Sequence, residues 1–175
     1  MSKSRKVRFL PFVLALAAVI SLSAVQVLAA DVPVEAGSPA ATDSQAVANY
    51  KAEVVRLVNI EREKAGVADL AAMDKLADMA DVRAQEASTD FRHVRPDGSR
   101  CFTIFGEYSL RYYAAGENLA CGFKTPEEVV KAWMNSASHK QNLLDADFTY
   151  IGIGYYLSDS GTPYWSQLFY TPKSY

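Results

Sequence analysis

Histidine and cysteine are scarce in this sequence, which contains two of each among its 175 residues. It has no Cys-x-x-Cys pair, no His-Glu-x-x-His segment and no Gly-x-Ser-x-Gly segment. The absence of these patterns argues against a structural zinc site, a helix-borne zinc-protease site and the nucleophile elbow of an α/β-hydrolase. Any site chemistry must therefore use residues that lie far apart in the sequence.

A surplus of basic charge is also missing. The formal net charge is −2, and four of the 18 basic residues lie within the first eight positions. Without these four, 14 basic residues remain against 20 acidic ones, a charge of −6. A mildly acidic protein offers no electrostatic footprint for nucleic acid, so we expect no nucleic-acid partner. The length and the 50% hydrophobic content are typical of one globular domain plus a leader.

Charge is absent from residues 9–30, which follow the basic N-terminal segment. A basic segment, an apolar run and a small-residue cleavage site ending at Ala29 or Ala30 predict a signal peptide over residues 1–30. The alternative is an uncleaved membrane anchor, because the run is about long enough to span a bilayer. We therefore expect a protein that is secreted or held at the cell envelope, and a membrane contact only through this segment if it stays uncleaved.

The rest of the chain divides into a linker and a domain. Residues 31–43 are rich in Pro, Ala, Ser and Gly, which predicts a flexible linker. The domain is predicted over residues 44–175. Helical spacing predicts helices from about Ser44, over about Met73–Ser88, after the Thr125 capping box and over about Ser138–Leu144, and a short one within 102–113. Period-two segments predict a hairpin of 150–157 with 164–170, and a third strand within 117–123. Helices followed by a hairpin favour an α+β fold, with helices packed on a small antiparallel sheet.

The two cysteines, Cys101 and Cys121, form an even pair in a chain with an export signal. An oxidising compartment favours a disulfide between them. The bond would close a loop of about 20 residues and contribute roughly 3 kcal/mol in the chain-entropy model. The alternative is a pair of free thiols buried in the fold.

The two histidines occur in short, distinctive segments. His93 precedes an Arg-Pro-Asp-Gly turn, His139 follows a Ser-Ala-Ser segment, and Glu117 lies between Gly116 and Asn118. Histidine is the side chain that titrates near neutral pH and the commonest metal ligand. We therefore predict one shared site made by the two imidazoles and the carboxylate. Two histidines and one carboxylate are also a set that holds catalytic zinc, although no helical spacing joins them here.

Other interpretations of these segments remain open. Ser136 and Ser138 lie close to His139 and are candidates for a nucleophile, but serines before a helical histidine are more often helix caps. The aromatic residues of 102–113 are expected in the core, or they line a groove for an apolar or polysaccharide ligand. The site residues also fit a purely structural role, in which they only bond neighbouring loops.

Several segments, in order over about residues 50–170, resemble the CAP superfamily, which groups cysteine-rich secretory proteins, antigen 5 and pathogenesis-related 1 proteins. The similarity is greatest to the compact bacterial, SCP-like branch. The matching segments are Val58–Gly66, Leu76–Glu86, Phe91–Gly98, Gly116–Ala120, Trp133–Leu144, Phe148–Gly154 and Tyr164–Phe169.

The resemblance implies an exported α-β-α sandwich of about four helices around a small antiparallel sheet. It also implies a cleft that, in eukaryotic members, holds a divalent cation such as zinc with two histidines and two glutamates. His93 matches the first histidine of that set and Glu117 the first glutamate. Ser136 stands where those members have the second glutamate, and Asp147 where they have the second histidine. We interpret His139 as the replacement used by the bacterial branch.

These observations lead to one functional expectation and one alternative. We expect a secreted, non-enzymatic CAP domain whose cleft, comprising His93, Glu117, His139, Asn118 and Ser136, binds a lipid, cell-wall or host component. Zinc or another divalent cation is expected to be weakly held, if at all, by the two histidines and Glu117. The alternative is a metal-dependent or acid-base hydrolase, resembling a peptidase, that uses the same residues.

Overall fold

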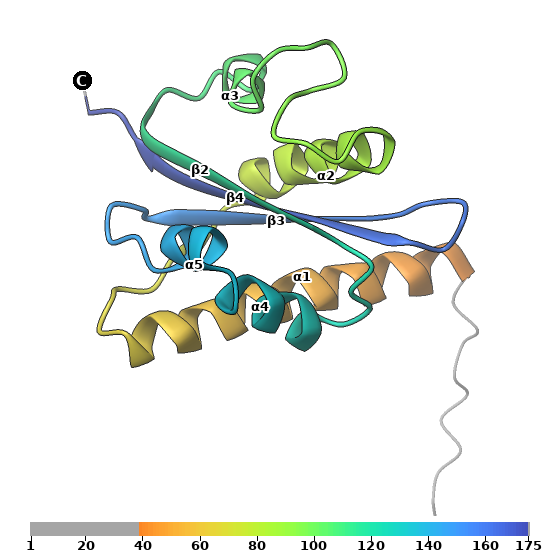
Figure 1. The fold of residues 1–175 in the computed structure, drawn as a ribbon, viewed down its shortest axis with the longest axis horizontal. Coiled ribbons are helices and arrows are strands. Elements are labelled where there is room, and N and C mark those ends of the chain that lie inside the picture. The colour runs from red at the N-terminus through yellow and green to blue at the C-terminus, as the bar shows by residue number, and fades with distance from the viewer. Residues whose placement is uncertain (1–38, 175) are drawn as a thin grey trace, which may run out of the picture. The chain divides into compact units, whose positions relative to one another are not determined.

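The computed structural model describes residues 39–174, so the predicted signal peptide over residues 1–30 lies outside the described part. Five helices and four strands follow one another in this part of the chain (Figure 1). Their order is α1 Pro39–Lys64, β1 Ala71–Ala72, α2 Asp74–Thr89, α3 Thr103–Glu107, β2 Tyr112–Cys121, α4 Pro126–Met134, α5 Ala137–Leu143, β3 Tyr150–Leu157 and β4 Pro163–Pro172.

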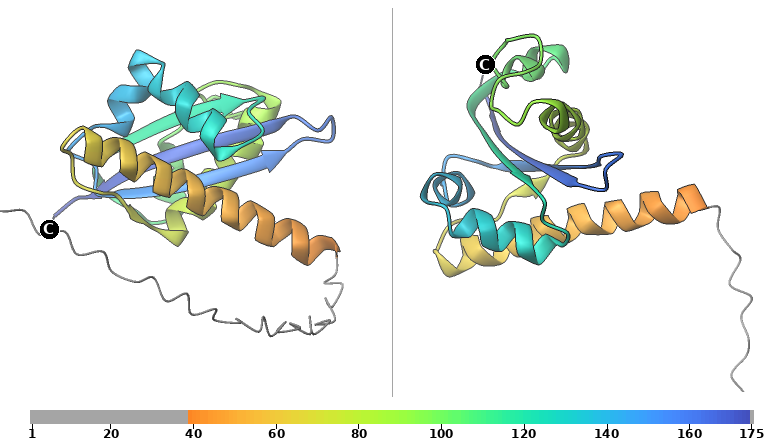
Figure 2. Two further views of the ribbon diagram at one scale, coloured as in Figure 1. Left: turned by 90° about the horizontal axis from the view of Figure 1, so that it is seen from below. Right: turned by 45° about the vertical axis from the view of Figure 1, so that its right-hand side comes forward.

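The strands form one mixed sheet in the order β1-β3-β4-β2. Strands β3 and β4 make the predicted antiparallel hairpin, β2 pairs antiparallel with β4, and the two-residue β1 pairs parallel with β3. Helices α2 and α3 lie on one side of the sheet, and α1, α4 and α5 lie on the other (Figures 1 and 2). The molecule therefore has the α-β-α sandwich that we expected, with five helices where the resemblance implied about four.

Helix α2 packs unusually close to the sheet. Its inner face is buried at all of the positions that helical spacing predicts: Leu76, Met79, Ala80, Arg83, Ala84 and Ala87. Two glycines of β3 permit this approach, because a Cβ atom at Gly154 would lie 2.0 Å from the carbonyl oxygen of Ala80. A Cβ at Gly152 would meet the backbone of Leu76 at 2.3 Å. The close contact fixes α2, and with it Arg83, against the sheet.

Strand β2 is an edge strand, and side chains from the helices cover its free edge. Residues of β2 whose carbonyl groups point away from β4 would otherwise leave acceptors without partners. The Asn142 amide donates to the Glu117 carbonyl at 3.2 Å, and the Trp133 indole donates to the Leu119 carbonyl at 3.3 Å. These two bonds attach α4 and α5 to β2 and so bring His139 to this edge.

A second anchor holds the C-terminal end of α5. The guanidinium of Arg62, from α1, is fully buried and donates to the carbonyl groups of Leu143 and Asp145 at 2.8 and 2.9 Å. It also donates to the carbonyl of Ala68 at 2.7 Å. Burial lowers the pKa of Arg62, and the negative charges of Asp145 and Asp69 offset part of this lowering. One arginine thus connects α1 to the end of α5 that follows the histidine.

Two sequence-based expectations differ from the structure along α1 and β1. Helix α1 begins at Pro39, five residues before Ser44, so the last residues of the predicted linker are helical. Proline is favoured in the first helical turn and the two alanines that follow are strong helix formers, which explains the earlier start. Strand β1 was not predicted, because two residues carry no periodicity. None of the helices in residues 39–174 is long and apolar enough to cross a membrane.

The expected disulfide is wrong for this structure, in which both cysteines are free thiols. The buried Cys101 lies beside the Glu117 carboxylate. Cys121 is exposed and lies four residues beyond Glu117 on the same extended strand, about 13 Å away at 3.3 Å per residue. Because a disulfide needs Cα atoms within about 7 Å of each other, the direction of β2 separates the pair.

Candidate functional site

The centre of the candidate site is the carboxylate of Glu117, which is buried on β2 with 1% of its side chain exposed. Its Oε2 accepts a hydrogen bond from Arg83 Nε at 2.7 Å, and its Oε1 accepts one from Arg83 Nη2 at 3.2 Å. The guanidinium of Arg83 is itself fully buried and forms a second ion pair with Glu86. This two-point contact from α2 fixes the carboxylate in one orientation.

His93 completes the contacts of this carboxylate. Its Nδ1 lies 2.8 Å from Glu117 Oε1. An ionised carboxylate only accepts hydrogen bonds, so the Nδ1–H group must donate. The imidazole extends from the loop after α2, and 57% of its side chain is exposed. The bond therefore holds one edge of an otherwise solvent-exposed ring, and no residue of 39–174 is hydrogen-bonded to Nε2.

The charge state of Glu117 follows from these contacts. Burial alone raises its pKa, but the hydrogen bonds from His93 and Arg83 and the charge of Arg83 outweigh that effect. The pKa of Glu117 is therefore lowered from its ordinary value, and the carboxylate stays ionised at neutral pH. An ionised, immobile carboxylate orients the His93 ring throughout the physiological pH range.

His139 approaches the same edge from the other side of the sheet. It lies in α5, and burial lowers its pKa, with a further lowering from the charge of the nearby His93. Asn118 is fully buried and donates to the backbone carbonyl of His139 at 3.1 Å. Adjacent residues of β2 point to opposite faces of the sheet. Glu117 thus holds His93 on one face, while Asn118 holds His139 on the other.

A network of buried side-chain amides positions the backbone of His139. The Asn118 amide also donates to Gln167 of β4 at 2.9 Å, and its carbonyl oxygen accepts from Asn142 of α5 at 2.8 Å. The side-chain nitrogen of Gln167 is buried and has no partner among residues 39–174. The network ties α5, β2 and β4 together, so the position of His139 depends on all three elements.

Not every predicted site residue joins the cluster. Ser136 occupies the N-cap position of α5 without a capping bond, and its hydroxyl lies 3.4 Å from that of Ser138. Within the described part of the chain, no hydrogen bond connects either serine to an imidazole. The structure therefore places Ser136 at the start of the His139 helix, and among residues 39–174 no hydrogen bond joins it to the His93–Glu117 pair.

Three residues that contribute to the site were not singled out from the sequence: Arg83, Asn142 and Gln167. Arg83 was predicted on the inner face of its helix, where a charged side chain among small apolar ones is itself a signal of a buried partner. Asn142 and Gln167 lie within segments that resemble the CAP superfamily, but nothing in their local sequence distinguishes them from surface amides.

The predicted zinc ligands do not form a ligand set in this arrangement. Among residues 39–174, no three His, Cys, Asp or Glu side chains are grouped as a metal site. Both oxygens of Glu117 already accept hydrogen bonds, and the buried guanidinium of Arg83 neutralises its charge. A cation would have to compete with that guanidinium. The residues as placed do not fit a zinc site, and no step of the proposed function uses a metal.

The chain is similar to known proteins in sequence and in fold. The chain is 42% identical over 125 residues to the Bacillus subtilis protein YkwD, an alignment that covers 70% of this chain and 48% of YkwD. This chain therefore spans about half the length of that relative.

Solved structures show the same fold. An extracellular protein with an SCP domain from Bacillus anthracis superposes with a TM-score of 0.64 at 26% identity, covering 70% of this chain and 40% of that one. An outer surface protein from Borrelia burgdorferi superposes with a TM-score of 0.63 at 24% identity, covering 69% and 90%. The model of the CAP family, described as the Cysteine-rich secretory protein family, matches residues 55–169. These residues include the Glu117 site and make up most of the chain, so this protein belongs to the Cysteine-rich secretory protein (CAP) family.

Proposed function

We propose that this protein is an exported CAP module that binds an extracellular ligand at a site formed by His93 and His139, without turning the ligand over. The observation that carries the proposal is the bond from His93 Nδ1 to the buried Glu117 carboxylate, in a side chain that is 57% exposed. A preoriented imidazole on a rigid support is a strong point of contact for a polar ligand, because little side-chain entropy is lost on binding.

His139 supplies the second imidazole of the proposed site. The lowered pKa of His139 favours its neutral form at pH 7, in which one ring nitrogen donates and the other accepts. His93 and His139 are held on different faces of β2, so a ligand that reaches both must lie across the edge of that strand. Cell-wall fragments, lipid headgroups and host glycans carry hydroxyl, amide and phosphate groups of the kind that imidazoles bind.

Two further observations support action outside the cell. The first 30 residues have the pattern of a signal peptide. The neighbouring structures from Bacillus anthracis and Borrelia burgdorferi are described as an extracellular protein and an outer surface protein, respectively. Export predicts that protein recovered from the culture medium begins near Ala30 or Asp31, which N-terminal sequencing would detect. Recovery of full-length chain from the membrane fraction alone would contradict cleavage.

The same His93–Glu117 pair also suits a second function, a hydrolase. A carboxylate that orients an imidazole is a general-base arrangement. Catalysis would then need a nucleophile or an activated water beside His93. Among the described residues, no hydroxyl or thiol side chain is hydrogen-bonded to either imidazole. Binding without turnover stays our first proposal, because it needs only the preoriented imidazole, and hydrolysis is the alternative.

The presence of two histidines makes a direct test simple, because imidazole NMR spectra of the chain contain two ring systems. The probes are a soluble muropeptide, vesicles of phosphatidylglycerol and zinc chloride, each added to the purified full chain. We expect one organic probe to shift both imidazoles saturably, and the shift of His139 to weaken in His93→Gln. Lys124→Gln, at an exposed position away from the site, is the matched control and should bind as the wild type does.

Each other outcome contradicts the proposal. If no probe at millimolar concentration shifts either imidazole, the two rings do not form a binding site for these classes. If zinc alone shifts both rings, the site binds a cation and our account of Glu117 is wrong. If mass spectrometry detects muropeptide fragments that His93→Gln fails to produce, the protein is a hydrolase and the alternative function replaces binding.

A further inference from the structure

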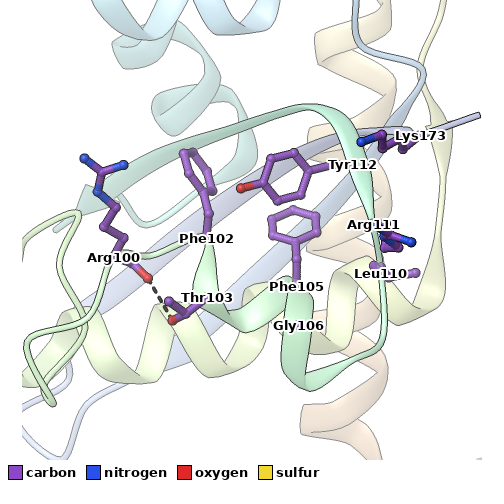
Figure 3. Close-up of a pocket in the computed structure, with 9 residues that line it drawn as sticks. All are labelled: Arg100, Phe102, Thr103, Phe105, Gly106, Leu110, Arg111, Tyr112 and Lys173. Atoms are coloured by element: carbon purple, nitrogen blue, oxygen red, sulfur yellow. Dashed lines mark hydrogen bonds between the residues drawn. The ribbon is translucent and has the colours of Figure 1, made fainter.

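A cavity lies away from the histidine site, where α3 faces the first residues of β2. Its volume is about 550 Å³, which is in the range of small-molecule sites. Tyr112, which lines it, precedes Glu117 by five residues on β2, a separation of about 16 Å along the strand. Figure 3 shows the cavity lined by aromatic rings at its centre and basic side chains at its two sides. The histidine site makes no use of these residues.

Three aromatic rings form the floor of the cavity. Phe105 is buried, and its ring centroid lies 5.1 Å from that of Tyr112, with Phe102 6.1 Å from Tyr112. The rings are inclined to one another by 57° to 65°, so they do not form a parallel-walled slot. The Tyr112 side of the floor is open, since 40% of this residue is exposed. A partly exposed aromatic ring beside a cavity offers apolar surface to a ligand.

The basic residues around the floor keep their charged groups free. Arg111 contributes its backbone carbonyl to bonds from the Tyr170 hydroxyl and the Lys173 amide. Arg100 likewise uses its carbonyl, which accepts from Thr103. Within residues 39–174, no carboxylate pairs with the side chains of Arg100, Arg111 or Lys173. The backbone bonds position these residues, while their cationic ends point to solvent beside the aromatic floor.

Among the arginines of the described chain, the lack of side-chain partners is particular to this cavity. The other arginines of residues 39–174 all make side-chain hydrogen bonds: Arg56, Arg62, Arg83, Arg92 and Arg95. Glu107, an acidic residue of α3 next to the cavity, is paired with Arg95 and does not neutralise the rim. A chain with a net charge of −2 thus concentrates unpaired arginines at one aromatic surface.

We propose that this cavity binds an anionic glycan, a short run of sugars that carry carboxylate, sulfate or phosphate groups. Sugar rings are puckered and place C–H groups against tilted aromatic faces, whereas planar nucleobases favour stacking on a parallel face or in a slot. The guanidinium groups of Arg100 and Arg111 bind carboxylate and phosphate oxygens in pairs. Arg100 lies at one side of the rings, and Arg111 and Lys173 lie at the other, which fits a ligand with two or more anionic groups (Figure 3).

Calorimetric titration of the purified full chain tests this proposal. The probes are tetragalacturonate and a chondroitin sulfate tetrasaccharide, with the neutral cellotetraose as their uncharged counterpart and oligo-deoxythymidylate as a nucleic-acid counterpart. The first two probes distinguish carboxylated from sulfated sugars. We expect at least one to bind, with affinity that falls as salt rises from 50 to 300 mM. Arg111→Gln should weaken binding about fivefold, because its guanidinium contacts the ligand and its backbone bonds are unchanged.

Two further variants separate a specific site from general attraction. Tyr112→Leu removes the exposed ring and should weaken binding at least fivefold, and circular dichroism verifies that the variant is folded. Lys124→Gln removes a positive charge at the far end of β2 and should leave binding unchanged. Equal affinity for cellotetraose would overturn the proposal, as would equal losses in Lys124→Gln and Arg111→Gln. Tighter binding of oligo-deoxythymidylate than of either charged glycan would assign the cavity to another class of ligand.

Discussion

Replacement of the buried carboxylate by an amide, Glu117→Gln, is the perturbation with the most directly calculable effect. The change removes the charge that faces Arg83 and turns one acceptor oxygen into an N–H donor, which meets Arg83 or His93. Arg83 is fully buried, so its charge loses one of two carboxylate partners. Breaking a buried ion pair from one side costs about 3–5 kcal/mol. Because Glu86 and the Arg92 carbonyl still contact Arg83, we expect the free energy of unfolding to fall by about 3 kcal/mol, the lower end of this range.

Urea denaturation at pH 7 measures this loss, and thermal unfolding should show a fall in Tm of about 10 °C. The pKa of Glu117 is lowered in the folded state, so its ionisation stabilises the fold above the unfolded value of about 4.3. The difference between wild type and variant should therefore shrink as the pH falls below about 4.3. Glu127→Gln, at an exposed position of α4, is the control and should change stability by less than about 0.5 kcal/mol. A loss below about 1 kcal/mol for Glu117→Gln at pH 7 would show that the buried Arg83–Glu117 pair does not stabilise the fold.

Three further predictions concern the histidine helix, the close helix-sheet contact and the thiols. The pKa of His139 is lowered in the folded state, so protonation of this ring favours unfolding below about pH 6.5. His139→Asn should therefore reduce the loss of stability between pH 7 and 5.5. An unchanged loss in the variant would argue against a lowered pKa of His139. Gly154→Ala should cost at least about 3 kcal/mol, because the new Cβ meets a helix carbonyl, while Gly106→Ala, with open space around it, should be neutral within about 0.5 kcal/mol in the same urea assay. Mass spectrometry after alkylation should show rapid labelling of Cys121 and labelling of Cys101 only on unfolding, because burial raises the pKa of Cys101 to about 12. Equal labelling rates for the two thiols, or a disulfide between them, would contradict the structure.

Features that depend on local sequence could be predicted, and the structure confirms them. The buried face of α2 follows from helical spacing, and the start of α4 follows from the Thr125 cap, whose hydroxyl accepts from the Glu128 amide. The β3–β4 hairpin follows from two segments with period-two patterns separated by a turn. In each case the information lies within one continuous segment of the sequence, so that no knowledge of the tertiary fold is needed.

Features that depend on pairing between distant segments could not be predicted from the sequence. Strand β1 contains two residues and exists because it pairs parallel with β3. The partner of Arg83 lies 34 residues away in Glu117, and only the packing of α2 on the sheet brings them together. The disulfide expectation failed for the same reason: the spacing of two cysteines does not reveal that an extended strand separates them.

The candidate site lies between these two cases. The motifs that carry the CAP resemblance identified His93, Glu117 and His139, and the structure directly joins the first two. Sequence alone did not reveal that Glu117 and Asn118, as neighbours on an edge strand, hold one imidazole on each face of the sheet. The sequence also left open whether the Glu117 carboxylate binds a metal or pairs with an arginine, which depends on how α2 packs on the sheet.

We propose that His93 and His139 act within one electrostatic environment across the edge of β2. An NMR titration of the His139 ring in wild type and in His93→Gln, both treated with chelator, measures that coupling. We expect a higher pKa for His139 in the variant, because the charge of His93 lowers it in the wild type, and a value still below 6.5, because burial remains. An identical His139 pKa in the two proteins would contradict a shared site.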